Sequence, residues 1–191
     1  MSRTIESLKE YVPYNEQERV DIEFFKECEE REQILTRENK RCHLCSSAFI
    51  INKDRNKVLC IYHNIYNSWT WVGGHADGDD DMVYVAKKET EEETSLKNFK
   101  LLSLSPIAID SLPVASHIKR GKFIPAHTHL SVAYLVEADE NETIKIKADE
   151  NSNIGWLTFD ELLNSSKEPH MVKVFEKIIE RIKNGFGLKK I

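Results

Sequence analysis

Long apolar runs are absent from this 191-residue sequence, and a membrane-spanning helix would need about 20 such residues in a row. Glycine and proline are scarce, with seven and five residues, which excludes collagen-like and low-complexity chains. Four cysteines are too few for a disulfide framework in a chain of this size. The N-terminal stretch is charged throughout and does not resemble a secretory signal. We therefore expect a reduced, soluble protein of the cytoplasm with no membrane partner.

An excess of positive charge is also missing. The 27 lysine and arginine residues are outnumbered by 32 aspartate and glutamate residues, which gives a net charge of −5. Such a chain lacks the general attraction for phosphate backbones that nucleic-acid-binding proteins show, so no nucleic-acid partner is expected. Hydrophobic residues make up 40% of the chain, enough for the core of one domain with an appendage.

The first part of the chain has a helical pattern. One helix is expected over 4–11, ending near Pro13, and a second over 15–35. Apolar residues recur at helical spacing along the second segment and form one apolar face. We expect residues 1–40 to be an N-terminal helical extension that packs on the main domain or on a second subunit, which makes a homodimer a reasonable expectation.

Residues 41–191 have the pattern of a single layered domain. The expected strands are 42–52 and 57–64, joined as a hairpin by the turn sequence KDRN, followed by 99–109, 127–138 and 143–147. Residues 111–126 are expected to be a long irregular connection. Helices are expected over 80–95, after the capping box of Thr158 and Glu161, and after Pro169. Strands interleaved with helices predict a mixed α/β or α+β domain.

An acidic cluster lies in the middle of the chain. Glu89, Glu92 and Glu93 are spaced at i, i+3 and i+4, so a helix places them on one face, and Glu91 adds a fourth carboxylate nearby. Clustered carboxylates without soft ligands favour Mg²⁺, Mn²⁺ or Ca²⁺. Most acidic runs are only solvated surface. Here, however, a Gly-Gly turn and an acidic loop lead directly into the cluster, which favours a metal site.

This stretch resembles the Nudix box, whose pattern is G-x5-E-x7-R-E-U-x-E-E-x-G-U, with U a bulky aliphatic residue. The register needs no insertion, and the positions that match outright are Gly74, Glu89, Glu92, Glu93 and Leu96. The departures are Asp80 for Glu, Lys88 for Arg, Thr90 for the aliphatic residue and Ser95 for Gly. The similarity extends over about residues 41–165, and none of the departures removes a carboxylate that the family uses to hold metal.

The resemblance implies a fold and an activity. The fold would be a Nudix-type α/β/α sandwich with a mixed β-sheet, preceded here by the helical extension. The activity would be metal-dependent hydrolysis of a phosphoanhydride bond in a small molecule, a nucleoside diphosphate linked to another moiety, with Mg²⁺ or Mn²⁺ as cofactor. An alternative is a Nudix-fold sensor that binds a nucleotide but barely cleaves it, and the four departures motivate it.

The resemblance also assigns roles to residues. Glu89, Glu92, Glu93 and the backbone carbonyl of Gly73 would hold the metal. Lys88 would pair with a ligand glutamate, for which Glu92 is available at i+4. The catalytic base would be Glu89 or a later carboxylate, with Glu150 favoured over Glu137 and Asp149. Asp80 would brace the junction between loop and helix, or simply cap the helix.

Substrate contacts are expected from aromatic, basic and histidine side chains. Trp69 would stack on a ring of the substrate, whereas Trp71 is expected in the core. His75 lies beside the glycines, and Arg120, in a basic loop with His117, Lys119 and Lys122, would clamp phosphates.

Two further motifs are ambiguous. His127 and His129 alternate along a strand and share one face, where they would contact substrate, lie in the core, or bind zinc if a third ligand joined them. Cys42 and Cys45 form a C-x-x-C motif, but on a strand they face opposite ways, which disfavours a joint metal or redox site.

Overall fold

The computed structural model describes residues 2–119, 121–147 and 151–187. The helices are α1 (Arg3–Ser7), α2 (Glu16–Arg31), α3 (Met82–Thr94), α4 (Phe159–Ser165) and α5 (Pro169–Lys183). The strands are β1 (Cys42–Asn52), β2 (Lys57–His63), β3 (Ser68–Thr70), β4 (Val72–His75), β5 (Phe99–Leu101), β6 (Ala108–Val114), β7 (His117–Lys119), β8 (Lys122–Ile124), β9 (His127–Ala138) and β10 (Asn151–Thr158).

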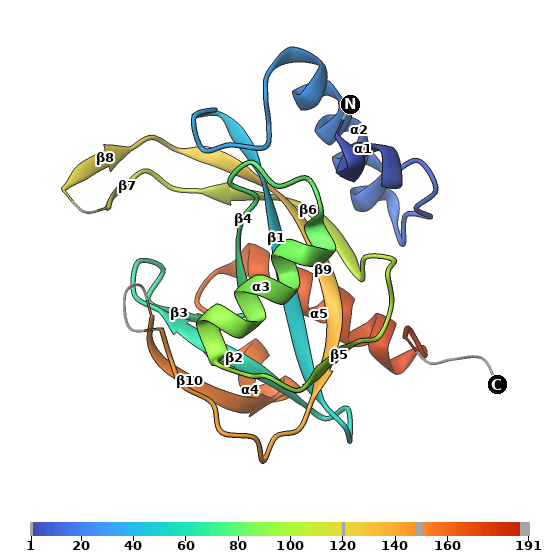
Figure 1. The fold of residues 1–191 in the computed structure, drawn as a ribbon, viewed down its shortest axis with the longest axis vertical. Helices are drawn as coiled ribbons and strands as arrows, with labels where there is room; N and C mark the ends of the chain where they lie inside the picture. The colour runs from blue at the N-terminus through green and yellow to red at the C-terminus, as the bar shows by residue number, and fades with distance from the viewer. Residues whose placement is uncertain (1, 120, 148–150, 188–191) are drawn as a thin grey trace.

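A mixed eight-stranded sheet forms the centre of the molecule (Figure 1). Its main path runs β10-β2-β1-β9-β5, while β3 pairs with β2, β4 with β1, and β6 with β9. β1 and β9 are parallel along their whole length, and the other pairs are antiparallel. The predicted hairpin of β1 and β2 is confirmed. Strands β7 and β8 form a separate two-stranded hairpin.

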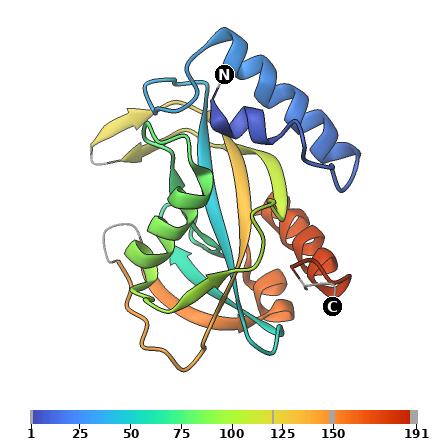
Figure 2. The ribbon, with the colours of Figure 1, turned by 45° about the vertical axis from the view of Figure 1, so that its right-hand side comes forward.

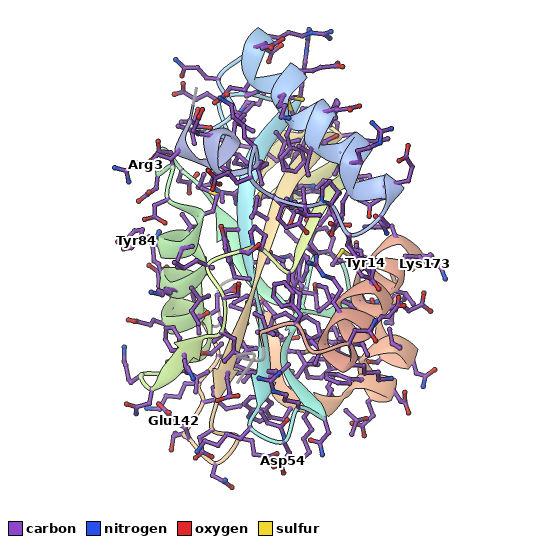
Figure 3. All side chains as sticks on the ribbon, turned by 90° about the vertical axis from the view of Figure 1, so that its right-hand side faces the viewer. Arg3, Tyr14, Asp54, Tyr84, Glu142 and Lys173 are labelled. Atoms are coloured by element: carbon purple, nitrogen blue, oxygen red, sulfur yellow. The ribbon has the colours of Figure 1, made fainter. Side chains whose placement is uncertain are left out.

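Helices cover both faces of this sheet, as the side view in Figure 3 shows, with α3 on one side and α4 and α5 on the other. Alternate residues of β1 supply the two cores. Leu44 packs with Met82 of α3, whereas Phe49 packs with Phe159 of α4 and Phe175 of α5. The predicted α/β/α sandwich with a mixed sheet is therefore confirmed.

The N-terminal helices lie across one end of the sheet (Figure 2). Ile5 of α1 and Phe25 of α2 are buried in the same apolar cluster as Leu44 of β1 and Val132 of β9. Of the two expected roles for this arm, the structure shows packing on the main domain, because the arm and the sheet share one core.

A buried ionic network fastens the arm to the C-terminal helix. The Glu18 carboxylate of α2 is completely buried and lies 3.1 Å from Lys177 Nζ and 3.6 Å from Arg181 Nη1, both on α5. It accepts hydrogen bonds from the Tyr11 hydroxyl at 2.7 Å and from the Ile109 N–H at 3.3 Å. Burial of such charges is tolerated only where partners of this kind surround them.

Five expected elements differ from the structure. The strand expected over 99–109 is split into β5 and β6, because residues 103–106 loop out between them. Two backbone hydrogen bonds to β9 flank this loop: the Leu102 N–H donates to the Leu135 carbonyl and the Ile107 N–H donates to the Ala133 carbonyl. Residues 111–126 are not irregular, since β6 continues to Val114 as an edge strand and β7 and β8 follow. Pro113 is tolerated there because an edge strand does not need every N–H.

The short strand expected over 143–147 does not form. The Lys145 N–H donates instead to the carbonyl of Thr94 at the end of α3, at 2.9 Å, so this segment bonds to a helix end rather than to a strand. The N-terminal helices are also shorter than expected, since α1 ends at Ser7 and α2 at Arg31. In the part of the chain that the structure describes, no helix is long and apolar enough to span a bilayer.

The Glu18 network predicts a large stability loss on substitution. Glu18→Gln removes the buried carboxylate beside Arg181 and leaves Lys177 with Asp110, 2.7 Å away, as its remaining buried partner, so the free energy of unfolding should fall by about 3 kcal/mol. Urea unfolding measures this change. Glu23→Gln on the exposed side of α2, where Glu23 pairs with Arg19 at the surface, is the matched control and should leave the midpoint almost unchanged. Equal midpoints for the two variants would contradict the anchoring role.

Candidate active site

A cavity of about 400 Å³ opens over the ends of β1, β4 and β9. The β2–β3 turn contributes Ile65 and Tyr66 to its wall, and the β7–β8 hairpin contributes His117 and Lys119. In Figure 1 the hairpin lies above the turn, on the left of the view. Helix α3 contributes Glu89, Glu92 and Glu93 together with Lys88. The volume suits a small-molecule ligand.

Helix α3 places its three predicted metal ligands at this cavity. Its other face is buried through Val85, Ala86 and Thr90, so the helix is fixed in rotation against the sheet. Tyr84 points away into solvent, as Figure 3 shows. The Glu89 side chain keeps only 13% of its surface exposed, so it is turned into the cavity wall, whereas Glu92 keeps 42% and lies at the solvent-exposed rim of the cavity.

The two glycines of β4 make the close approach of α3 feasible. A Cβ atom on Gly74 would stand 2.4 Å from Cδ of Glu89, and one on Gly73 would stand 2.5 Å from Oγ of Ser47 on β1. At Gly73 the backbone carbonyl of Ser46 would also stand only 2.8 Å away, so only glycine fits there. At Gly74 a side chain would displace the carboxylate of Glu89 from its place. The Gly-Gly pair is therefore not the turn that the sequence analysis expected, since both glycines belong to strand β4 and leave space for a neighbouring strand and a carboxylate.

Glu93 is the most tightly held of the three carboxylates. It accepts hydrogen bonds from the Gly73 N–H and from Nδ2 of Asn151, each at 3.0 Å. Burial raises the pKa of Glu93 to about 7, and burial also raises the pKa of Glu89. Among the described residues, Oδ1 of Asn151 is buried without a partner. Desolvated carboxylates beside an unpaired amide oxygen form a hard, oxygen-only donor set that fits Mg²⁺ or Mn²⁺.

Two lysines adjoin the carboxylates. Nζ of Lys88 lies 3.9 Å from an oxygen of Glu89 and 3.9 Å from an oxygen of Glu92, the partner expected at i+4. Nζ of Lys147 lies 3.1 Å from the other oxygen of Glu92, and this hydrogen bond raises the pKa of Lys147. The sequence analysis did not single out Lys147 or Asn151, because no motif marks residues that reach the site from a distant loop and strand.

The departures from the Nudix box are accommodated locally. The hydroxyl of Thr90 is buried but donates to the Ala86 carbonyl at 2.8 Å, and Ser95 ends the helix in the left-handed region with φ 60°. Asp81, not Asp80, is the helix N-cap. The Asp80 carboxylate accepts from the Arg3 N–H at 3.2 Å, while its backbone carbonyl accepts from the Thr4 hydroxyl at 3.0 Å. Asp80 thus ties the loop before α3 to the N-terminal helix.

A cluster of histidines and one cysteine lines the same cavity. In the β-sheet register Cys45 is opposite His75 of β4, and His43 is opposite His129 of β9. Because side chains alternate along a strand, all four point to the same face of the sheet, and His127 joins them. The His43 ring centroid lies 5.0 Å from that of His75, 4.9 Å from that of His127 and 5.1 Å from that of His129.

Burial disfavours the charged form of three of these imidazoles, those of His43, His75 and His129. Desolvation, with further contributions from the neighbouring histidines, lowers the pKa of His75 to about 3 and that of His129 to about 2, and the pKa of His43 is lowered as well. Burial also raises the pKa of the Cys45 thiol. Cys42 lies on the opposite face of β1, in the core with Leu44, as the strand geometry predicts.

The other expected site residues lie in different places. Trp71 is buried against Phe175 with ring centroids 5.7 Å apart, so its core placement is confirmed, although it also borders the cavity. Trp69 packs edge-on against Tyr62 and is not among the residues that line the cavity. Glu137 lies elsewhere, 4.0 Å from Arg55. Arg120, Asp149 and Glu150 fall outside the described residues.

Comparison with known proteins agrees with this geometry. The sequence profile of the NUDIX domain matches residues 43–178, which is most of the chain. The chain therefore belongs to the NUDIX domain family. An RNA pyrophosphohydrolase of Pelagibacter ubique is 27% identical over 139 residues, covering 70% of this chain and 87% of that protein. Together these matches support an enzyme that acts on pyrophosphate bonds.

Solved structures show the same fold at low sequence identity. A NUDIX family hydrolase from Clostridium perfringens superposes with a TM-score of 0.55 at 17% identity, covering 73% of this chain and 97% of that one. The Ap4A hydrolase of C. elegans gives a TM-score of 0.54 at 15% identity, covering 73% and 98% respectively. At such identities the similarity establishes the fold alone.

The raised pKa of Glu93 predicts a pH dependence of stability in metal-free protein. A buried carboxyl with a raised pKa stabilises the fold at low pH, and this contribution is lost as the pH rises from about 4.5 through 7. In EDTA, the melting temperature of the wild type relative to Glu93→Gln should therefore fall by roughly 5 °C between pH 5 and pH 8. A pH-independent difference between the two melting curves would show that Glu93 does not titrate in this range.

Proposed function

We propose that this protein hydrolyses a phosphoanhydride bond in a nucleoside diphosphate linked to another moiety, with Mg²⁺ or Mn²⁺ as cofactor. The observation that carries the proposal is the convergence of Glu89, Glu92 and Glu93 at one cavity. These carboxylates face a space of small-molecule size, where a divalent cation would offset their mutual repulsion. Gly73, on the adjacent strand, would add its backbone carbonyl as a ligand.

When bound, the cation would neutralise the pyrophosphate and lower the pKa of an attacking water. The described residues contribute orientation and charge around it. The Gly73 N–H and the Asn151 amide hold the carboxylate of Glu93 in one orientation, which leaves little to reorganise during the reaction. Glu89, pressed against Gly74 and desolvated, is suited to hold metal or to accept a proton from water.

The lysines would face the charged part of the substrate. Lys88 and Lys147 both lie beside Glu92, so a polyphosphate entering the cavity would meet two ammonium groups as well as the cation. Glu150 remains our proposed base outside the box. His127 and Arg120 remain proposed substrate contacts, and so do His75 and His129 for as long as no metal ion binds them. Trp69 also remains one, although its place outside the cavity lining would require a long substrate.

The substrate class stays broad. The names of similar proteins refer to RNA and Ap4A, and a dihydroneopterin triphosphate pyrophosphohydrolase of E. coli shares the fold with a TM-score of 0.54. We favour a small nucleotide derivative over RNA, because the net charge of −5 does not favour a nucleic-acid partner. We also place the enzyme in the cytoplasm, which four unpaired cysteines support, and we keep the homodimer as a proposal.

A second candidate function is a nucleotide sensor that binds without cleaving. The observation that favours it is the state of Glu92, which is engaged by Lys88 and Lys147, so that a cation must compete with two ammonium groups. A panel of nucleoside triphosphates, sugar nucleotides, dinucleoside polyphosphates, NAD-like dinucleotides and 5′-polyphosphorylated RNA separates the two. Thermal stabilisation by a ligand without release of products would favour the sensor, and product formation would favour the hydrolase.

Substitution of the carboxylates tests the metal-site assignment. Glu92→Gln and Glu93→Gln should each lower kcat on the best substrate by about 100-fold or more, since each removes a charge that holds the cation. The far-ultraviolet circular dichroism should be unchanged. Glu91→Gln is the matched control on α3, because Glu91 pairs with Lys97 at the surface and does not line the cavity. Wild-type turnover in both ligand variants would refute the assignment.

Removal of divalent cations gives an independent test. Hydrolysis should stop in EDTA and return on addition of Mg²⁺ or Mn²⁺, because the carboxylate set holds hard cations. Turnover measured before and after readdition reports this directly. Activity that persists in excess EDTA would contradict metal dependence.

A further inference from the structure

We propose a second metal site in this protein, in which His43, Cys45, His75 and His129 bind Zn²⁺. Three imidazoles and a thiol are the ligands of tetrahedral zinc centres, and they differ in kind from the oxygen-only set on α3. The site lies in the same cavity, next to Gly74, and it would be occupied independently of the cation needed for hydrolysis.

The sheet register already brings the donors together. The candidate ligand atoms of these four residues all lie within 4.8 Å of one another. In a tetrahedral site with bonds of about 2.0–2.3 Å, neighbouring ligand atoms are roughly 3.3–3.8 Å apart. Side-chain adjustments of the order of 1 Å would therefore complete the coordination, and the backbone of β1, β4 and β9 would not have to move.

The second observation is an unpaired imidazole nitrogen. His43 is 4% exposed, and its Nε2 atom is buried with no partner among the described residues. Its Nδ1 atom lies 3.1 Å from the carbonyl of Asn39, which fixes the proton there and leaves a lone pair on Nε2. A buried polar atom without a partner is costly, and a metal ion would satisfy it. Such a backbone carbonyl behind a ligand histidine is typical of metal sites.

His127 supports the cluster from its edge. Its Nδ1 atom lies 2.9 Å from the Pro125 carbonyl, and its Nε2 atom lies 3.2 Å from Nε2 of His129. The first contact assigns the proton of His127 to Nδ1, so its Nε2 accepts a hydrogen bond from the Nε2–H of His129. This leaves Nδ1 of His129 as the atom that would bind the metal. We treat His127 as a positioning residue that orients the ring of His129.

The chemistry of the cluster disfavours a phosphate as its occupant. A phosphate anion needs donors or positive charge, whereas His43 and His127 use their N–H groups on backbone carbonyls and the cysteine presents sulfur. Sulfur is a ligand for soft and borderline metal ions and has no role in holding phosphate. On binding Zn²⁺, the Cys45 thiol would lose its proton to solvent and coordinate as thiolate.

Four protein ligands would close the coordination sphere, which is typical of structural zinc. The ion would join β4 and β9 to β1, since His75 and His129 lie on either side of the central strand. It would thereby fix the floor of the cavity directly beside the glycines that receive Glu89. We infer a positioning role for this zinc, with the hydrolytic cation held separately.

Cobalt substitution tests the site on the full-length protein. Co²⁺ takes the same ligands as Zn²⁺, and a cobalt–thiolate bond adds a charge-transfer absorption in the near ultraviolet. Titration of metal-free protein should give this band at one equivalent of Co²⁺, and one equivalent of Zn²⁺ should remove it while excess Mg²⁺ should not. Cys45→Ala should abolish the band, whereas Cys42→Ala, whose thiol lies on the other face of the same strand, should retain it.

Two further variants complete the design. His129→Gln should weaken Zn²⁺ binding by about 100-fold or more, which gives a second measure if Cys45→Ala proves unstable. Glu93→Gln should retain the cobalt band, because it belongs to the other site. A wild type without the band, equal bands in the two cysteine variants, or loss of the band in Glu93→Gln would each overturn the proposal. Absence of hydrolysis in the wild type would bear only on the proposed function.

Discussion

The register of β1 against its two neighbours is the constraint on which the rest of this structure depends. Pairing with β4 places Gly73 opposite Ser47 and His75 opposite Cys45, and parallel pairing with β9 places His129 beside His43. A slip of one residue would turn all these side chains to the other face of the sheet. The side chains of β1 point alternately to the two faces of the sheet, and those on each face pack against different helices. A slip would exchange the two sets of side chains between the two cores, so the packing on both faces prevents it.

The cavity consequently contains two donor sets of opposite character. Helix α3 contributes carboxylates from one turn, and the sheet floor contributes imidazoles and a thiol. Each set contains desolvated groups, but burial acts on them in opposite directions, since it raises the pKa of Glu93 and lowers that of His75. Hard and soft ligands within one cavity would let different metal ions occupy different places without competition, because each ion prefers its own set.

The sequence predicted those parts of the site that depend on local spacing. Glu89, Glu92 and Glu93 share a helical turn, so their common face followed from the i, i+3 and i+4 pattern, and the alternation of His127 and His129 followed from strand geometry. The histidine and cysteine cluster was not predictable as a unit, because it joins three strands whose pairing is set by the whole sheet. Lys147 and Asn151 were missed for the same reason. The strand expected over 143–147 failed because the Thr94 carbonyl takes the hydrogen bond of Lys145.

The N-terminal arm has a mechanical consequence for the enzyme. At one end, Arg3 and Thr4 donate hydrogen bonds to Asp80 in the loop before α3. At the other end, Glu18 forms ion pairs with Lys177 and Arg181 of α5. The arm therefore connects the two helical layers across the end of the sheet. Separation of the two helical layers would therefore require the contacts at both ends of the arm to break.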